Sequence, residues 1–229
     1  MALSRWTLAV ALVTLSAGDH SPLRAGSTDT VGQGASAQPR PETVKPADLP
    51  RFPEFVGGVV SAQRKGDRIL ICADQAISPF GGSVRKLDHP QLFLLNREIL
   101  EEVRGQPGLC HGAWSPTADE FAAISPAGVW LFHVPLDPGR LVRTATLNDR
   151  GTVAYVTGRP PKWAPNGRLL ALAVTRHAGG SPDVVDTIEV IDAASGALVL
   201  ATPMHQDFEW TPDSGALRVG KSLVKLPAR

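Results

Sequence analysis

Short apolar runs separated by turn residues follow one another from about residue 56 to the end of the chain. The runs at 68–73 and 168–175 are continuous, which is typical of strands covered on both faces. Pro, Gly, Asn and Asp stand between the runs and favour tight turns. The pattern predicts strands at Val56–Ala62, Arg68–Ala73, Gln91–Asn96, Ile99–Val103, Leu109–Ser115, Glu120–Ile124, Gly128–Val134, Arg140–Leu147, Arg159–Trp163, Arg168–Thr175, Thr187–Asp192, Ala197–Thr202, His205–Thr211, Ala216–Val219 and Ser222–Leu226.

One segment also fits a helix. Leu, Glu and Arg favour helical backbone, and they dominate Leu92–Arg104. No amphipathic helical pattern follows residue 105, so the sequence predicts an all-β protein in which this segment is the single ambiguity.

A short motif recurs along the chain at near-even spacing. It consists of Trp, one residue, Pro and a turn, followed by an apolar run, and it begins at Trp114, Trp163 and Trp210. A copy without Trp is placed at Ala62, which gives steps of 52, 49 and 47 residues (114−62, 163−114 and 210−163). Internal repeats of this length indicate a propeller or another repeat array.

Each repeat holds about four short strands, as a propeller blade requires. Pro fixes the backbone at the first inner position of a tight turn, and a following Gly, Asn or Asp tolerates unusual dihedrals. The preceding Trp has enough apolar area to fill the seam between two blades. The residues assigned to this structural role are Trp114, Pro116, Trp163, Pro165, Gly167, Trp210 and Pro212.

The third repeat resembles the repeat of TolB-type, or WD-type, β-propellers. Trp163-Ala-Pro-Asn-Gly167, an apolar strand and then Thr187–Asp192 follow the order of that repeat, and Trp114 and Trp210 carry the same frame. The resemblance implies a propeller over about residues 55–229. That family commonly has six or seven blades, so four repeats leave an incomplete or open ring as an alternative to a closed one.

The N-terminus has the pattern of a secretory signal. Arg5 precedes a short apolar run, Trp6–Ala17, and small residues allow cleavage after Gly18. An uncleaved membrane anchor and a chance apolar stretch are the alternatives. We therefore expect a periplasmic or secreted protein, with no membrane span after cleavage and with an anchored protein as the second choice.

The domain boundaries follow from composition. Residues 1–18 are the predicted signal peptide, and residues 19–54 are rich in Gly, Ser and then Pro, which predicts a disordered linker. Residues 55–229 form the predicted repeat domain, with repeats near 55–105, 106–150, 151–203 and 204–229. The last repeat is short and lacks an outer strand. Its open edge predicts a homodimer, unless Val56–Val60 adds to this blade and closes the ring.

Composition narrows the chemistry. The net charge of the 229 residues is +1, which gives no electrostatic reason to expect nucleic acid. In an oxidising compartment the two cysteines, Cys72 and Cys110, form a disulfide or remain two buried free thiols. Two cysteines are too few for a structural zinc site, and no other residues form a metal or cofactor motif.

Catalytic motifs are weak. Gly215–Ser222 matches the spelling of a phosphate-binding loop, but 216–219 fits a strand, and no long helix follows. The chain has no nucleophile elbow, and its histidines are scattered. Asp183, Asp186 and Asp192 lie close together but lack the spacing of a calcium loop. No catalytic residue is assigned, and the protein is not expected to be an enzyme.

Function is assigned to long loops on one face of the blades. Gln75–Pro90 and Arg176–Asp186 are the longest connections, and long loops on a rigid scaffold often bind partners. We expect a non-catalytic scaffold for a protein or other ligand; a detached propeller related to prolyl-oligopeptidase-type enzymes, or a small-ligand or metal-binding propeller, is the alternative. The candidate partner-binding residues are Phe80, Arg85, Lys86, His89, His177, Asp183 and Asp186.

Overall fold

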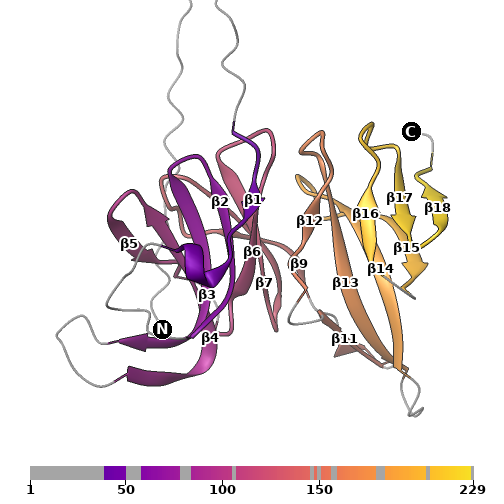
Figure 1. Ribbon diagram of the computed structural model, residues 1–229. Helices are drawn as coiled ribbons and strands as arrows, with labels where there is room; N and C mark the ends of the chain where they lie inside the picture. The colour runs from indigo at the N-terminus through magenta and orange to yellow at the C-terminus, as the bar shows by residue number, and fades with distance from the viewer. Residues whose placement is uncertain are drawn as a thin grey trace, which may run out of the picture. The chain divides into compact units, whose positions relative to one another are not determined.

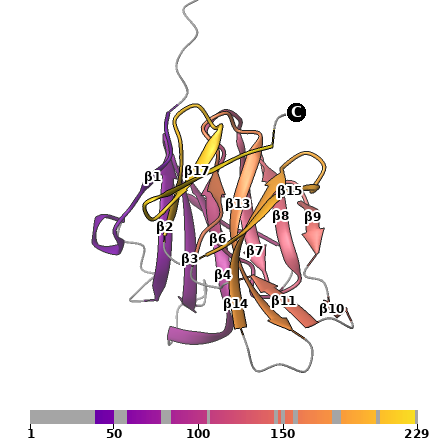
Figure 2. The ribbon, with the colours of Figure 1, turned by 90° about the vertical axis from the view of Figure 1, so that its right-hand side faces the viewer.

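The computed structural model describes residues 39–49, 58–77, 84–104, 107–144, 147–148, 151–155, 159–178, 184–204 and 207–227, all within one compact unit, Ala37–Arg229. These residues form strands and one short 3-10 turn (Figures 1 and 2). The predicted all-β class is confirmed. Leu92–Arg104 is not helical, because it lies in two paired strands. None of the described residues belongs to a helix that could cross a membrane.

Four antiparallel sheets follow one another in chain order (Figure 1). The first holds β1 (Glu42–Thr43), β2 (Val59–Lys65), β3 (Arg68–Ile77), β4 (Val84–Asn96) and β5 (Ile99–Glu102). The second holds β6 (Cys110–Trp114), β7 (Glu120–Ser125), β8 (Gly128–His133) and β9 (Arg140–Thr144). The third holds β10 (Leu147–Asn148), β11 (Gly151–Tyr155), β12 (Lys162–Trp163), β13 (Leu169–Ala178), β14 (Val184–Asp192) and β15 (Leu198–Pro203). The fourth holds β16 (Phe208–Trp210), β17 (Ala216–Val219) and β18 (Ser222–Lys225).

The register of the first hairpin in each sheet confirms the repeat. Trp114 pairs with Phe121, Trp163 with Leu170 and Trp210 with Leu217. In the first sheet the residue paired with Ile69 is Arg64. Arg64 therefore holds the position that Trp takes in the other repeats, two residues after Ala62, where the sequence had placed this copy. The turn here is shorter than in the other repeats, because Lys65 pairs with Arg68 directly and only Gly66 and Asp67 lie between them.

Apolar side chains pack between successive sheets. The first and second sheets share a cluster around Trp114, Phe121 and Phe132, in which the Trp114 and Phe121 rings meet edge to face at 5.3 Å. Two further clusters join the second sheet to the third and the third to the fourth. Each strand between two clusters is apolar on both faces, which explains the continuous apolar runs in the sequence.

A buried ion pair joins the outer parts of the second and third sheets. Glu189 on β14 is 1% exposed, and its carboxylate accepts a hydrogen bond from the Arg143 Nε at 2.8 Å. The Arg143 guanidinium also donates to the carbonyl of Gly196. The pair compensates a charge that would otherwise be costly to bury.

The linker prediction was wrong for residues 42–49. Glu42 and Thr43 pair with β2, and Pro46–Asp48 form the 3-10 turn η1. Val44 is buried in an apolar cluster on the first sheet, together with Ile69 and Ile71. Val44 and Leu49 thus pack residues 42–49 against the first sheet, although the Pro content of this segment had suggested a disordered linker. The signal segment and residues 19–38 lie outside the described residues.

The two long loops were also predicted wrongly in part. β3 continues to Ile77 and β4 begins at Val84, while β13 continues to Ala178 and β14 begins at Val184. Both connections are thus hairpins whose strands pair as far as Ile77 with Val84 and His177 with Val184. The polar residues at their ends hide the strand pattern in the sequence.

Ring closure by the N-terminal strand is contradicted. Val59 and Val60 belong to β2, and β2 pairs with β3 and β1 in the first sheet, not with the fourth sheet. In the described part of the chain, the fourth sheet has three strands and β18 pairs with β17 alone. The predicted lack of an outer strand is confirmed there.

Candidate functional site

A cleft of about 970 Å³ is lined by residues of β1, β2, β6, β12 and β16. We call it the Trp–Pro cleft. Of these strands, β2, β6, β12 and β16 each begin the hairpin that carries the repeat register, and we call them the first strands. The cleft volume is within the range of ligand sites, about 300–1,000 Å³. The cleft is lined by Arg40, Pro41, Thr43, Gln63, Ala113, Trp114, Pro116, Thr117, Pro160, Pro161, Lys162, Trp163, Pro165, Trp210 and Pro212.

The three repeat tryptophans are fixed by equivalent hydrogen bonds. The indole Nε1 of Trp114 donates to the carbonyl of Gln63, that of Trp163 to Ala113, and that of Trp210 to Lys162. The distances are 3.1, 2.8 and 2.9 Å. Each tryptophan therefore binds the first strand of the preceding sheet, at the residue one before the Trp position. Each indole thus bonds to the neighbouring sheet, and its N–H donor is already used.

Other polar groups of the first strands are also paired. The Gln63 side-chain oxygen accepts the backbone N–H of Trp114. Lys162 donates from Nζ to the carbonyl of Phe208 at 2.7 Å, and the same ammonium lies 4.9 Å from the centre of the Phe208 ring. Hydrogen bonds from the neighbouring sheet thus satisfy backbone groups along the edge of these strands.

The Trp-x-Pro turns form one wall of the cleft and touch each other. Gly167 has φ of +69°, and a Cβ there would meet the Thr117 Oγ1 at 1.8 Å, which explains Gly at this turn. Ser214 takes the same backbone conformation in the fourth sheet, and its hydroxyl accepts the N–H of Asn166. These contacts hold the turns of successive sheets in fixed positions.

The turn of the second sheet is held by a lysine instead. Lys65 is 5% exposed, and its Nζ donates to the carbonyls of Ser115 and Ala118 at 2.9 and 2.6 Å. Asp119 lies 3.8 Å from the same nitrogen. Burial lowers the pKa of Lys65, and the Asp119 carboxylate opposes that shift.

The charge of the cleft is positive. Arg40 and Lys162 are the charged residues of its described lining, which contains no carboxylate or imidazole.

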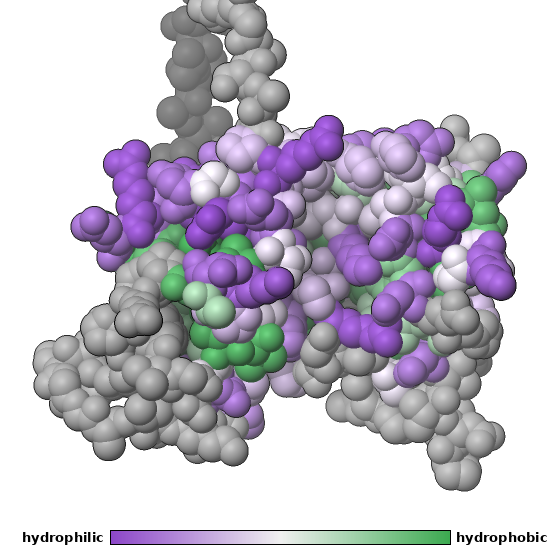
Figure 3. Space-filling model, viewed as in Figure 1, coloured by the Kyte–Doolittle hydropathy of each residue, from purple (hydrophilic) through white to green (hydrophobic). Residues whose placement is uncertain are grey.

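On the side seen in Figure 3, hydrophilic residues predominate and hydrophobic ones gather in separate patches over the first and last sheets. Aliphatic surface therefore marks no single site on that side, whereas the cleft combines aromatic rings with two cations.

The predicted partner-binding residues are only partly described. Phe80 and Asp183 lie outside the described residues. Arg85 and Lys86 lie on β4 and His177 on β13, and only their backbone is described. His89 and Asp186 are exposed, and Asp186 accepts a hydrogen bond from the Thr175 hydroxyl. His89 and Asp186, whose side chains are described, do not line the Trp–Pro cleft.

The aspartates considered for calcium are not brought together. Asp186 pairs with Thr175 and Asp192 pairs with Leu169, so the two lie six residues apart on β14. That separation is about 20 Å along a strand. Asp192 instead accepts hydrogen bonds from the backbone and hydroxyl of Ser195 and lies 3.4 Å from the Arg168 Nε, which is the arrangement of a turn.

The phosphate-loop spelling at Gly215–Ser222 has no phosphate-loop structure. Its residues form β17, a turn at Gly220 and Lys221, and the start of β18. A phosphate loop requires a helix N-terminus after the lysine, and the chain here turns back into an antiparallel strand. The sequence argument against nucleotide binding therefore has a structural basis.

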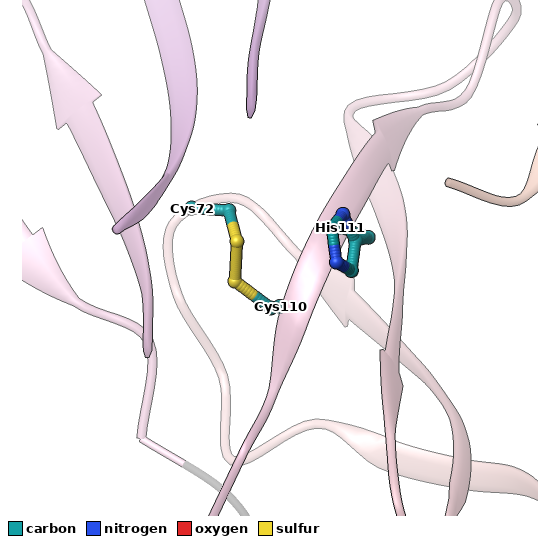
Figure 4. A group of neighbouring side chains, drawn as sticks. All are labelled: Cys72, Cys110 and His111. Atoms are coloured by element: carbon teal, nitrogen blue, oxygen red, sulfur yellow. A yellow bond between two sulfur atoms is a disulfide. The ribbon is translucent and has the colours of Figure 1, made fainter. Parts of the chain in front are cut away.

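Cys72 and Cys110 form a disulfide between β3 and β6, with their Cα atoms 5.2 Å apart (Figure 4). Of the two alternatives for these cysteines, the pairing is the one observed. His111 lies beside it, and its ligand atoms are within 4.8 Å of both sulfurs. Because both sulfurs are bonded to each other, this group offers no thiolate to a metal.

His111 should make the stability of the protein depend on pH. Burial lowers the pKa of His111 below its ordinary value of 6.5, so the folded protein keeps the ring neutral. Below pH 6.5 the unfolded chain binds a proton that the folded chain does not, and stability falls as the pH is lowered toward the folded pKa. We expect a loss of at most about 1.4 kcal/mol per pH unit in this window, measured by urea unfolding.

The matched variants separate this effect from general acid sensitivity. His111→Asn, which tolerates the positive φ of 51° at this position, should flatten the stability profile below about pH 6.5. His89→Gln changes an exposed histidine and should leave the profile unchanged. Equal slopes for wild type and His111→Asn would contradict the assignment.

No protein-family model and no curated protein matches the chain. Solved structures do. Acylaminoacyl peptidase from Pyrococcus horikoshii is 11% identical over 70% of this chain and 27% of its own, with a TM-score of 0.49. Dipeptidyl peptidase 4 from Porphyromonas gingivalis is 12% identical over 66% and 27%, with a TM-score of 0.42.

An oligogalacturonate lyase in complex with manganese is 14% identical over 71% of this chain and 53% of its own, with a TM-score of 0.41. This chain thus spans between about a quarter and a half of the length of these proteins. Identities this low concern the fold alone, and no residue role is transferred from them. The four antiparallel sheets in chain order remain the basis of the fold assignment.

Proposed function

We propose that the protein is an exported, non-catalytic β-propeller-type scaffold that binds an extended segment of a partner protein in the Trp–Pro cleft. The resemblance of its repeat to that of TolB-type propellers supports the scaffold role. The observation that carries the proposal is the cleft itself, to which all four sheets contribute an aromatic ring, a proline or a polar side chain. Concave aromatic surfaces are frequent sites for protein segments.

The rigidity of the cleft supports a binding role. The three indoles are each held by a hydrogen bond to the preceding sheet, and Trp163 and Trp210, which are only partly buried, need no reordering when a ligand arrives. Preorganised surfaces lose less conformational entropy on binding than mobile ones. The absence of carboxylate and imidazole groups from the described lining fits binding better than acid–base catalysis.

A panel of displayed peptides tests the proposal. A random peptide library is selected on the full-length protein, and the selected peptides are measured on a variant in which Thr43→Trp fills the cleft. Thr43 is exposed and lines the cleft, so the larger side chain occupies the ligand volume. We expect at least about a tenfold loss of affinity, since an occupied pocket excludes its ligand.

Two controls locate the effect. Glu42→Trp changes the neighbouring exposed residue on the same strand, which does not line the cleft. His89→Trp changes an exposed residue at the end of the sheets where the sequence analysis had predicted partner binding. Both should bind the selected peptides as wild type does. The proposal fails if no peptide is selected, or if Thr43→Trp binds as well as Glu42→Trp.

A further inference from the structure

We infer that the segment bound in the Trp–Pro cleft is acidic and rich in proline. This inference rests on the proposed function, because it names the chemistry of the ligand of the same site. It follows from three properties of the described lining, which are the hydrogen-bond acceptors already in use, the donors still present and the aromatic rings.

Backbone carbonyls on β2, β6, β12 and β16 already accept hydrogen bonds from neighbouring side chains. The carbonyls of Gln63, Ala113 and Lys162 each accept an indole N–H, and the carbonyl of Phe208 accepts the Lys162 ammonium. Each of these carbonyls already accepts one hydrogen bond, so a ligand N–H that entered the cleft without a well-oriented second lone pair to meet would lose its hydrogen bonds to water. An unpaired buried donor costs about 1–3 kcal/mol. Proline has no backbone N–H, and it therefore avoids this cost.

The donors of the cleft favour acceptors with negative charge. Arg40 is exposed and carries five N–H donors on a planar guanidinium. The Lys162 ammonium has three protons, of which one is used by the Phe208 carbonyl. Since no carboxylate is in the described lining to balance these cations, a ligand with Asp or Glu supplies the missing charge.

The aromatic surface suits proline as well. Pro-rich segments dock in aromatic grooves because their extended helix is preformed and loses little entropy on binding. A short stretch of this kind already borders the cleft in the chain itself. Pro39 lies 3.4 Å from the Cβ position of Gly66, and Pro41 lines the cleft with Arg40. The residues just before β1 therefore place a Pro-x-Pro segment of the chain itself beside the site.

Short synthetic peptides test the inference by fluorescence anisotropy with the full-length protein. The probe alternates proline and glutamate; the two matched peptides replace glutamate by lysine or proline by glycine. We expect the Pro/Glu probe to bind at least about tenfold more tightly than either. Its affinity should fall with added salt, because the charges of the site are near the surface.

Charge reversal locates the recognition. Arg40→Glu removes an exposed cation without touching the indole hydrogen bonds, and it should reduce the preference for Pro/Glu over Pro/Lys; thermal melting checks that the variant is folded. Equal binding of Pro/Glu and Pro/Lys, or no effect of Arg40→Glu, would overturn the inference. If the library selects peptides that Thr43→Trp fails to bind and that carry neither acid nor proline, this inference fails while the proposed function stands.

Discussion

Replacing Trp114 by alanine should destabilise the protein by about 3–5 kcal/mol, as expected for truncation of a fully buried aromatic residue. Trp114 is 1% exposed, packs edge to face on Phe121 and donates its indole N–H to the carbonyl of Gln63. The substitution removes all three interactions and leaves a cavity between the first two sheets. Urea unfolding followed by circular dichroism measures the loss.

The other repeat tryptophans provide graded controls. Trp163 and Trp210 make the equivalent hydrogen bonds but are only partly buried, so their alanine variants should lose less stability. Trp114→Phe keeps most of the apolar area and loses the indole donor. It also leaves the carbonyl of the half-buried Gln63 without that bond, and the two losses together should cost about 1–2 kcal/mol. Equal losses of unfolding free energy for the three alanine variants would show that the stabilisation by each Trp does not depend on how deeply it is buried.

Much of the fold could be predicted because each repeat carries its strand and turn signals in its own local sequence. Leu169, Leu170 and their neighbours form an unbroken apolar run, and the turn before them contains Pro165 and Gly167. Local turn chemistry and apolar runs agree there, so the strand positions follow from the sequence. The register in the first sheet did not follow, because Arg64 replaces the marker Trp and the turn is two residues long.

Two elements depended on distant contacts. β1 exists because Glu42 and Thr43 reach the free edge of β2, and nothing in its own sequence signals a strand. β11 pairs with the far half of β13, from Val174 to Ala178. Such pairings are decided by the tertiary structure and carry weak local signals.

The candidate site was missed for a related reason. The sequence showed Trp and Pro at regular spacing, which was interpreted as structural, and in the structure each indole N–H bonds to the preceding sheet. The cleft arises because the same residues also line the space between four first strands that are far apart in the chain. Loop length pointed to the opposite end of the blades, where the chain forms long hairpins instead. The repeat of Trp-x-Pro was the one available signal for the cleft.

Removing the disulfide should have an effect as large as the loss of Trp114. Cys72 and Cys110 are 38 residues apart, and a crosslink that closes a loop of this length stabilises the folded state by about 4 kcal/mol through the unfolded chain. The bond also joins β3 of the first sheet to β6 of the second, so it holds two sheets together. We expect Cys72→Ala/Cys110→Ala to unfold about 10 °C lower than wild type, measured by calorimetry.

Reduction of the wild-type protein provides the matching control. Cys72 and Cys110 are 1% and 2% exposed, so a dithiol reductant should act on them only when the protein opens. Added in urea near the unfolding midpoint, it should bring the wild-type transition down to that of the double alanine variant, because both then lack the same crosslink. It should not move the transition of the variant itself. A variant that unfolds within about 2 °C of oxidised wild type would contradict this expectation, since it would mean that packing between β3 and β6 holds the two sheets together without the crosslink.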